Sequence, residues 1–117
     1  MSFNVFRVWP LYLCLLLLSQ HSLFAKPPAP DFWISNLERV RFDSRQQSTP
    51  YVLSFFFIGC VPCVTEIPAL YNWMRSNAPE AELLFISPLK ADSKKNIERY
   101  ATQLQVPKSY FYSDPFG

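Results

Sequence analysis

Residues 51–70 read YVLSFFFIGCVPCVTEIPAL, and this stretch decides the fold. Its first part, residues 51–58, is an apolar run of strand length that is rich in aromatic and branched side chains. Such a run predicts a strand buried on both faces, as central strands of parallel sheets are. After Cys60 the apolar residues recur every three or four positions, which predicts a helix that begins just after this cysteine. Pro62 suits the first turn of that helix, whereas Pro68 lies deeper and should kink it.

The rest of the chain continues an alternation of strands and helices. Residues 83–86 form a second buried strand and residues 110–112 a short third one. Between them, Asp92 or Ser93 can cap a second helix that ends at Val106. Its apolar face comprises Ile97, Tyr100, Ala101 and Leu104. The order strand, helix, strand, helix, strand implies right-handed crossovers, so the predicted fold class is α/β with a parallel βαβαβ core.

The segments outside this core are shorter and less regular. Residues 32–41 suit a short strand or turn at the edge of the fold, and the polar residues 43–49 make a loop. Residues 114–117 have the residues of a tight turn, with Pro second and Gly fourth. The aromatic residues expected in the core are Trp33, Trp73 and Phe85. The basic residues expected on a solvated helix face are Lys90, Lys94, Lys95 and Arg99.

Composition excludes several classes of protein. The chain has 117 residues, of which 50% are hydrophobic, 17% aromatic and 17% charged. This length fits one small domain, and the content is too apolar for a disordered chain and too irregular for a coiled coil. The formal net charge is +2, and the basic residues are scattered among acidic ones. We therefore expect no nucleic-acid partner, because phosphate backbones demand a concentrated basic surface.

The N-terminal residues 1–25 have the pattern of a secretory signal peptide. Arg7 is their only charge, residues 8–18 are apolar, and Ala25 is the small residue that signal peptidase prefers. The apolar stretch is shorter than the ~20 residues that span a bilayer, so an uncleaved N-terminal anchor is the alternative. We expect an exported protein, periplasmic or secreted, that touches the inner membrane only if residues 8–18 remain as an anchor.

The remaining sequence divides at a short spacer. Residues 26–30, KPPAP, favour extended backbone because of their prolines, and residues 31–117 form the folded domain. Removal of the signal peptide would also remove Cys14 and His21. The processed chain would then hold two cysteines in an oxidising compartment.

Those two cysteines, Cys60 and Cys63, carry the chemistry. A cysteine at the junction of a strand and a helix places its sulfur beside unpaired backbone N–H groups and the positive end of the helix dipole, which favour the thiolate. Cys60 is therefore the predicted nucleophile, and Cys63, one helical turn further on the inner side, can resolve a mixed disulfide held on Cys60. Half of a zinc site or a structural disulfide would show the same spacing, but the processed chain has no other Cys and no His to complete a zinc site.

The segment from Phe55 to Leu70 resembles the active-site segment of the thioredoxin superfamily. More narrowly, it is similar to the exported thiol-disulfide reductases of the TlpA/ResA type. Their motif, C-x-P-C-x-x-E-x-P-x-L, is matched at every fixed position from Cys60 onward. Ala-Pro-Asp-Phe at residues 29–32 resembles the start of those domains. The resemblance implies a thioredoxin-like fold.

The resemblance also implies a function and a set of site residues. It implies an enzyme that reduces protein disulfides, in apocytochrome c or other exported thiol proteins, with electrons from a membrane donor. The redox-active disulfide would join Cys60 and Cys63, and Glu66 would tune the pair, with Pro62 and Pro68 supporting the motif. No cofactor and no metal ion are implied.

The sequence departs from the family pattern in three places. Gly59 stands where the family usually has Trp, so this chain lacks the aromatic lid that Trp would provide. Ser54 stands where thioredoxins carry a buried acid, and Glu66 is the candidate replacement. The chain stops at Gly117, where the family continues into a hairpin with a cis-proline and a last helix, so we expect an incomplete domain. Residues 110–112 would then be an unpaired sheet edge, and the domain alone would self-associate.

Two other functions would use the same cysteines. A peroxiredoxin-like thiol peroxidase would make Cys63 the peroxide-reactive thiol, but Phe56 and Cys60 stand where its Pro and Thr should be. A copper-binding carrier would hold the metal on Cys60 and Cys63, and would need a third ligand, usually a His, that the processed chain lacks. Both functions stay as alternatives.

Overall fold

The computed structural model describes residues 27–114. The chain divides into two compact units, Met1–Pro30 and Asp31–Gly117. The described part of the first unit is exposed and forms neither helix nor strand. The signal peptide or anchor expected over residues 1–25 lies outside the described residues, as does most of the turn expected over residues 114–117.

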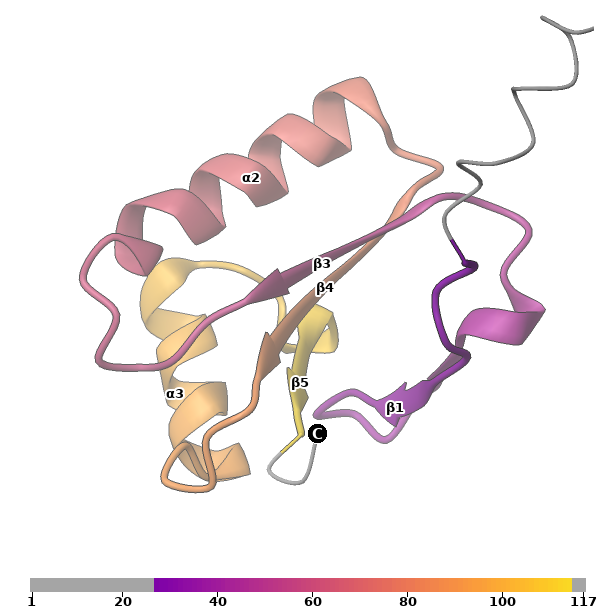
Figure 1. The fold of residues 1–117 in the computed structure, drawn as a ribbon. Helices are drawn as coiled ribbons and strands as arrows, with labels where there is room; N and C mark the ends of the chain where they lie inside the picture. The colour runs from indigo at the N-terminus through magenta and orange to yellow at the C-terminus, as the bar shows by residue number, and fades with distance from the viewer. Residues whose placement is uncertain (1–26, 115–117) are drawn as a thin grey trace, which may run out of the picture. The chain divides into compact units, whose positions relative to one another are not determined.

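Five strands and two helices make up the described part of the second unit (Figure 1). The strands are β1 (Trp33–Ser35), β2 (Arg41–Asp43), β3 (Tyr51–Phe55), β4 (Glu82–Ser87) and β5 (Phe111–Ser113). The helices are α2 (Cys63–Asn77) and α3 (Lys94–Leu104), and 3-10 turns occupy η3 (Ser44–Gln46) and η4 (Lys108–Tyr110). β3, β4 and β5 form one parallel sheet in that order, and β1 and β2 form an antiparallel hairpin. The α/β class with a parallel βαβαβ core is therefore confirmed.

The sheet separates two apolar layers, because successive side chains of a strand point to opposite faces. Both helices cover one face and the β1–β2 hairpin covers the other (Figure 1). The buried residues of the helix-side layer are Phe56, Cys63, Ile67, Met74, Leu83, Phe85, Ile97, Tyr100, Ala101, Val106 and Phe111. Those of the hairpin-side layer are Ile34, Phe42, Leu84, Ile86 and Tyr112. Cys63 therefore lies in the core on the helix side of the sheet.

α2 starts later than its apolar periodicity predicts. It begins at Cys63 rather than just after Cys60, because the Cys60 N–H first closes a turn by donating to the Phe57 carbonyl at 3.0 Å. Pro62 immediately precedes the helix with helical backbone, at φ −66°. The helix continues through Pro68, and the kink expected there stays a prediction.

α3 has the start that its sequence predicts. Ser93, rather than Asp92, is the cap, because the Ser93 Oγ accepts a hydrogen bond from the Asn96 N–H at 3.2 Å. Gln105 ends the helix in the left-handed region, at φ 57°. The expected apolar face is confirmed, with Ile97, Tyr100 and Ala101 buried. The expected solvated residues Lys90, Lys94, Lys95 and Arg99 are all exposed.

β3 is not the fully buried strand that the apolar run predicts. It ends at Phe55 and has a neighbouring strand on one side only within the described residues, so Phe55 is 65% exposed and Val52 is 37% exposed. β4 lies between β3 and β5, and its residues 83–87 are all buried. An apolar aromatic run indicates a strand, but the place of a strand in the sheet depends on partners that are distant in sequence.

The third strand also differs from its prediction. It spans Phe111–Ser113, because the 3-10 turn η4 occupies the residues just before it. The expectation that this strand is an unpaired edge is wrong. Asn36 forms an antiparallel bridge with Tyr112, and the Leu37 N–H donates to the Phe111 carbonyl at 3.1 Å. The hairpin thus covers the side of β5 that faces away from β4.

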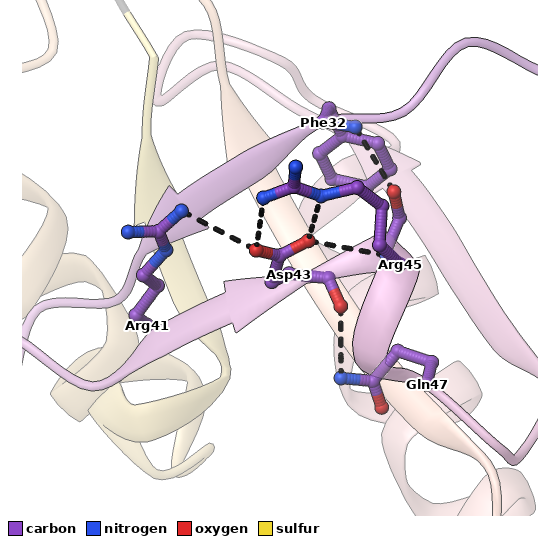
Figure 2. Close-up of polar contacts among 6 residues, drawn as sticks. Phe32, Arg41, Asp43, Arg45 and Gln47 are labelled. Atoms are coloured by element: carbon purple, nitrogen blue, oxygen red, sulfur yellow. Dashed lines mark hydrogen bonds and ion pairs between the residues drawn. The ribbon is translucent and has the colours of Figure 1, made fainter.

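The last residue of β2, Asp43, has a buried carboxylate that two arginines of the same strand and the following turn bind (Figure 2). Asp43 is 4% exposed and accepts hydrogen bonds from the Arg45 Nε at 3.0 Å and the Arg45 Nη2 at 2.8 Å. Arg41 donates to the same carboxylate from its Nη2 at 3.3 Å. The side-chain hydrogen bonds of Arg45, and then the positive charges, lower the pKa of Asp43 to about 2. Of residues 43–49, expected to form a plain loop, Asp43 ends β2 and Ser44–Gln46 form the turn η3.

Two of the three aromatic residues expected in the core lie at the surface. Trp33 is 62% exposed and Trp73 is 58% exposed, whereas Phe85 is fully buried as predicted. Each tryptophan is adjacent in sequence to the residue that faces the core, Ile34 in β1 and Met74 in α2. The Arg41 guanidinium lies 4.5 Å from the centre of the Trp33 ring, so this ring packs on a cation instead.

Candidate functional site

A disulfide bond joins Cys60 to Cys63 at the carboxyl end of β3, with the two Cα atoms 5.4 Å apart. Cys63 is the first residue of α2 and is buried, whereas Cys60 precedes the helix and is half-buried. The structure therefore brings together the two predicted redox residues. The unequal burial agrees with Cys60 as the outer sulfur and Cys63 as the inner one.

The backbone next to the disulfide forms the first turn of α2. The Val64 and Glu66 N–H groups donate to the Val61 and Pro62 carbonyls at 3.3 and 3.0 Å, and no side chain caps α2. The start of a helix carries the positive end of the helix dipole. A thiolate formed here on reduction would be favoured by that dipole.

Several exposed apolar side chains lie close to the two cysteines in the sequence. They are Phe55, Phe57, Val61 and Val64, with exposed fractions of 65%, 46%, 82% and 50%. Gly59, where the family usually has Trp, is exposed, and a Cβ added to it would meet only the Phe57 ring, at 3.7 Å. Phe57 thus lies beside the position of the missing aromatic lid.

Glu66 lies in the first turn of α2, one turn beyond Cys63. Its side chain is exposed, and within the described residues its carboxylate makes no hydrogen bond or ion pair. Ser54, which stands where thioredoxins carry a buried acid, is half-buried in β3. The tuning role of Glu66 stays a prediction.

Asp92 is a residue of this site that its sequence context did not reveal. It is 8% exposed, and its Oδ2 accepts hydrogen bonds from the Ile58 N–H at 3.1 Å and the Ser87 Oγ at 2.7 Å. Ile58 belongs to the segment that leads to Cys60. The carboxyl ends of neighbouring parallel strands meet at the same edge of a sheet, so an acid that follows β4 could have been expected near the residues that follow β3.

The described residues contain neither a metal centre nor a membrane span. Between residues 27 and 114, no group of three or more His, Cys, Asp or Glu side chains is placed to hold a metal ion. No helix in the same part of the chain is long and apolar enough to cross a membrane.

No protein-family model and no curated protein matches the sequence, but solved structures match the fold. A secreted disulfide oxidoreductase of Mycobacterium tuberculosis, homologous to E. coli DsbE, is 21% identical over 71% of this chain and 60% of its own, with a TM-score of 0.58. A thioredoxin-family thiol:disulfide interchange protein of Chlorobium tepidum is 22% identical over 78% of this chain and 63% of its own, with a TM-score of 0.62. The soluble domain of Sco1 from Bacillus subtilis is 12% identical over 72% of this chain and 52% of its own, with a TM-score of 0.57.

These similarities define the class of fold. The chain has the thioredoxin-like fold that its cysteine motif predicts, with a disulfide-forming pair where a strand gives way to a helix. It spans about three fifths of the length of the first two of these structures.

Proposed function

We propose that this protein is an exported thiol-disulfide oxidoreductase that reduces disulfide bonds in other proteins. The observation that carries the proposal is the Cys60–Cys63 disulfide, held between the end of β3 and the start of α2, with Cys60 half-buried and Cys63 buried. The thioredoxin-like fold supports it, because disulfide oxidoreductases are among the structures with that fold.

The reaction follows from the placement of the two sulfurs. In the reduced protein, the Cys60 thiolate attacks one sulfur of a substrate disulfide; a mixed disulfide forms, and the other substrate sulfur leaves as a thiolate that takes up a proton. Cys63 then loses its proton and attacks the Cys60 Sγ, which releases the second substrate sulfur. The substrate has gained two electrons and two protons, and the protein ends as the Cys60–Cys63 disulfide.

A dithiol donor must return two electrons to the oxidised protein for each cycle. Because an exported reductase works in an oxidising compartment, we infer that this donor is a membrane protein with a reactive dithiol. The resemblance to TlpA/ResA-type reductases favours apocytochrome c or another exported thiol protein as the substrate. The exposed apolar side chains close to the two cysteines in the sequence suit an unfolded polypeptide better than a small polar thiol.

Insulin-disulfide reduction with dithiothreitol as the donor tests the proposal. We expect the full chain to accelerate the reduction, and both the Cys60→Ser and Cys63→Ser variants to lose turnover. Cys14→Ser is the matched control, because it removes a cysteine outside the pair. An uncatalysed rate with the wild-type protein, or full turnover in Cys60→Ser, would contradict the proposal.

Copper binding is the second candidate, favoured by the shared fold with Sco1. Two thiolates are soft ligands that suit Cu(I). Addition of Cu(I) to the reduced protein distinguishes the two functions. A copper carrier retains one Cu(I) per chain through Cys60 and Cys63 after gel filtration against a competing chelator, whereas a disulfide reductase loses it.

A further inference from the structure

The segment that carries Cys60, residues 56–62, is weakly tied to the rest of the domain. Apart from its bonds with α2, which follows it directly, two hydrogen bonds among the described residues connect it to other elements. The Phe56 N–H donates to the Ile86 carbonyl at 3.0 Å, and the Ile58 N–H donates to the Asp92 Oδ2 at 3.1 Å. The first bond extends the sheet, so Asp92 is the side chain that holds the segment once it has left β3.

Asp92 is itself fixed by the sheet. Its Oδ2 also accepts from the Ser87 Oγ at 2.7 Å, and Ser87 is fully buried at the end of β4. The Asp92 N–H donates to the Leu89 carbonyl at 3.0 Å, which closes the loop between β4 and α3. The carboxylate is therefore a rigid acceptor, and the position of the Ile58 N–H is set by the central strand.

A side chain of α3 also packs against this segment. The Tyr100 ring stacks on the Phe56 ring, with centroids 5.7 Å apart and planes 5° apart. Tyr100 also lines one cavity together with Asp92 and Ile58. Phe56 and Ile58 are thus held by Tyr100 and Asp92.

We propose that Asp92 is a positioning residue for the disulfide exchange proposed above, and that it holds Cys60 at the start of α2 through its hydrogen bond with the Ile58 N–H. Asp92 touches no substrate and acts through the backbone. Without this acceptor the half-buried Ile58 N–H loses its partner. The segment then rearranges to satisfy it, and the Cys60 sulfur leaves the helix end that favours its thiolate.

The hydrogen bond and the charge of Asp92 have opposite effects on Cys60. Asp92→Asn keeps an oxygen acceptor for Ile58 and removes the negative charge, whereas Asp92→Ala removes both. A repulsive charge alone would make Cys60 more reactive in both variants. A positioning hydrogen bond makes Cys60 less reactive in Asp92→Ala only.

The test is the rate at which iodoacetamide alkylates Cys60 in the reduced full chain at neutral pH, measured by mass spectrometry of the peptide that contains it. We expect Asp92→Ala to react about tenfold more slowly, because its Cys60 sulfur no longer lies at the helix end that favours the thiolate. Asp92→Asn should react within about twofold of wild type, because it keeps an oxygen acceptor for the Ile58 N–H. Asp43→Ala is the matched control, because it removes another buried carboxylate, in the β1–β2 hairpin, that does not contact residues 56–62.

Three results would overturn the inference: a wild-type rate in Asp92→Ala, faster alkylation in both Asp92 variants, or an equal loss in Asp43→Ala. If Asp92→Ala does not fold, Asp92→Ser takes its place, since its short hydroxyl cannot reach Ile58, and a wild-type rate in it overturns the inference in the same way. Alkylation needs no protein substrate, so its outcome is independent of the insulin assay. If the full chain reduces insulin but the alkylation rate of Cys60 does not change in Asp92→Ala, only the role of Asp92 is rejected. If the alkylation rate changes as expected but the full chain does not reduce insulin, only the proposed function is rejected.

Discussion

At the scale of single residues, two buried carboxylates fix backbone that would otherwise be loosely held. Asp43 binds Arg41 and Arg45 within the hairpin, and Asp92 binds the Ile58 N–H across 34 positions of sequence. A buried carboxylate is stable only when donors satisfy its oxygens. The donors to Asp43 lie two residues before and two residues after it in the sequence. The Ile58 N–H that donates to Asp92 is brought close to it only by folding.

The ion pairs of Asp43 make the stability of the hairpin depend on acid pH. Its pKa is about 2 in the folded protein, against 3.8 ordinarily, so its contribution is complete above pH ~4 and is lost as the pH falls towards 2. We expect Asp43→Asn to be less stable than wild type near neutral pH, and the difference to shrink over that range. Urea unfolding midpoints measure it, with exposed Glu80→Gln as the control. A difference that stays constant down to pH 2 would show that the charge of Asp43 does not matter.

Tyr112 has the opposite pH dependence. Its burial, and then the charge of Glu82, raise the pKa of its hydroxyl to about 12 from 10.0. The neutral form is favoured in the folded state, so its contribution is fully present below pH ~10 and is lost as the pH rises towards 12. We expect Tyr112→Phe to lose less stability than wild type between these values, as measured by thermal unfolding. Equal alkaline losses in the two proteins would reject this assignment.

At the scale of elements, local sequence signals predicted where helices and strands form. They did not predict which elements lie next to one another. The strand at residues 83–86, the cap at Ser93 and the apolar face of α3 depend on residues close in sequence, and the structure confirms them. The edge position of β3 and the cover over β5 depend on pairing between distant segments, so composition could not give them. The cysteine pair could be found from its spacing alone, whereas Asp92 could be found only by expecting residues that follow neighbouring parallel strands to lie close together.

The cap of α3 should have a measurable effect on stability. Ser93→Ala removes the Oγ that accepts from the Asn96 N–H, and we expect it to cost about 1 kcal/mol of unfolding free energy. Ser93→Asp keeps an acceptor and should retain most of that stability. Denaturant unfolding of the three proteins provides the comparison. Equal stabilities of Ser93→Ala and wild type would mean that the hydrogen bond is not a net contributor.

At the scale of the whole molecule, both faces of the sheet are covered, but its two edges are not covered equally. Helices and hairpin cover the faces, and the hairpin also reaches β5, but β3 has one strand neighbour within the described residues. An apolar strand with free N–H and C=O groups is a template for pairing with another chain. The edge that favours association is therefore β3, next to the cysteines.

The edge position of β3 predicts how residues 26–117 behave when they are expressed alone. We expect them to self-associate, and Val52→Lys to reduce the association, because a lysine on an exposed edge strand opposes pairing. Val40→Lys is the matched control, since Val40 is exposed outside β3. Sedimentation velocity measures the oligomer distribution. A monomeric wild-type fragment, or equal effects of the two substitutions, would show that β3 is not the associating edge.

The most direct test of the central claim, that Cys60 attacks the substrate and Cys63 resolves the mixed disulfide, is to trap the intermediate. The reduced Cys63→Ser and Cys60→Ser variants of the full chain are incubated with insulin, and the mixed disulfides are located by mass spectrometry. We predict that Cys63→Ser accumulates a mixed disulfide through Cys60, because the resolving thiol is gone, and that Cys60→Ser accumulates little, because Cys63 is buried. Trapping through Cys63 in Cys60→Ser, with none through Cys60 in Cys63→Ser, would contradict the claim.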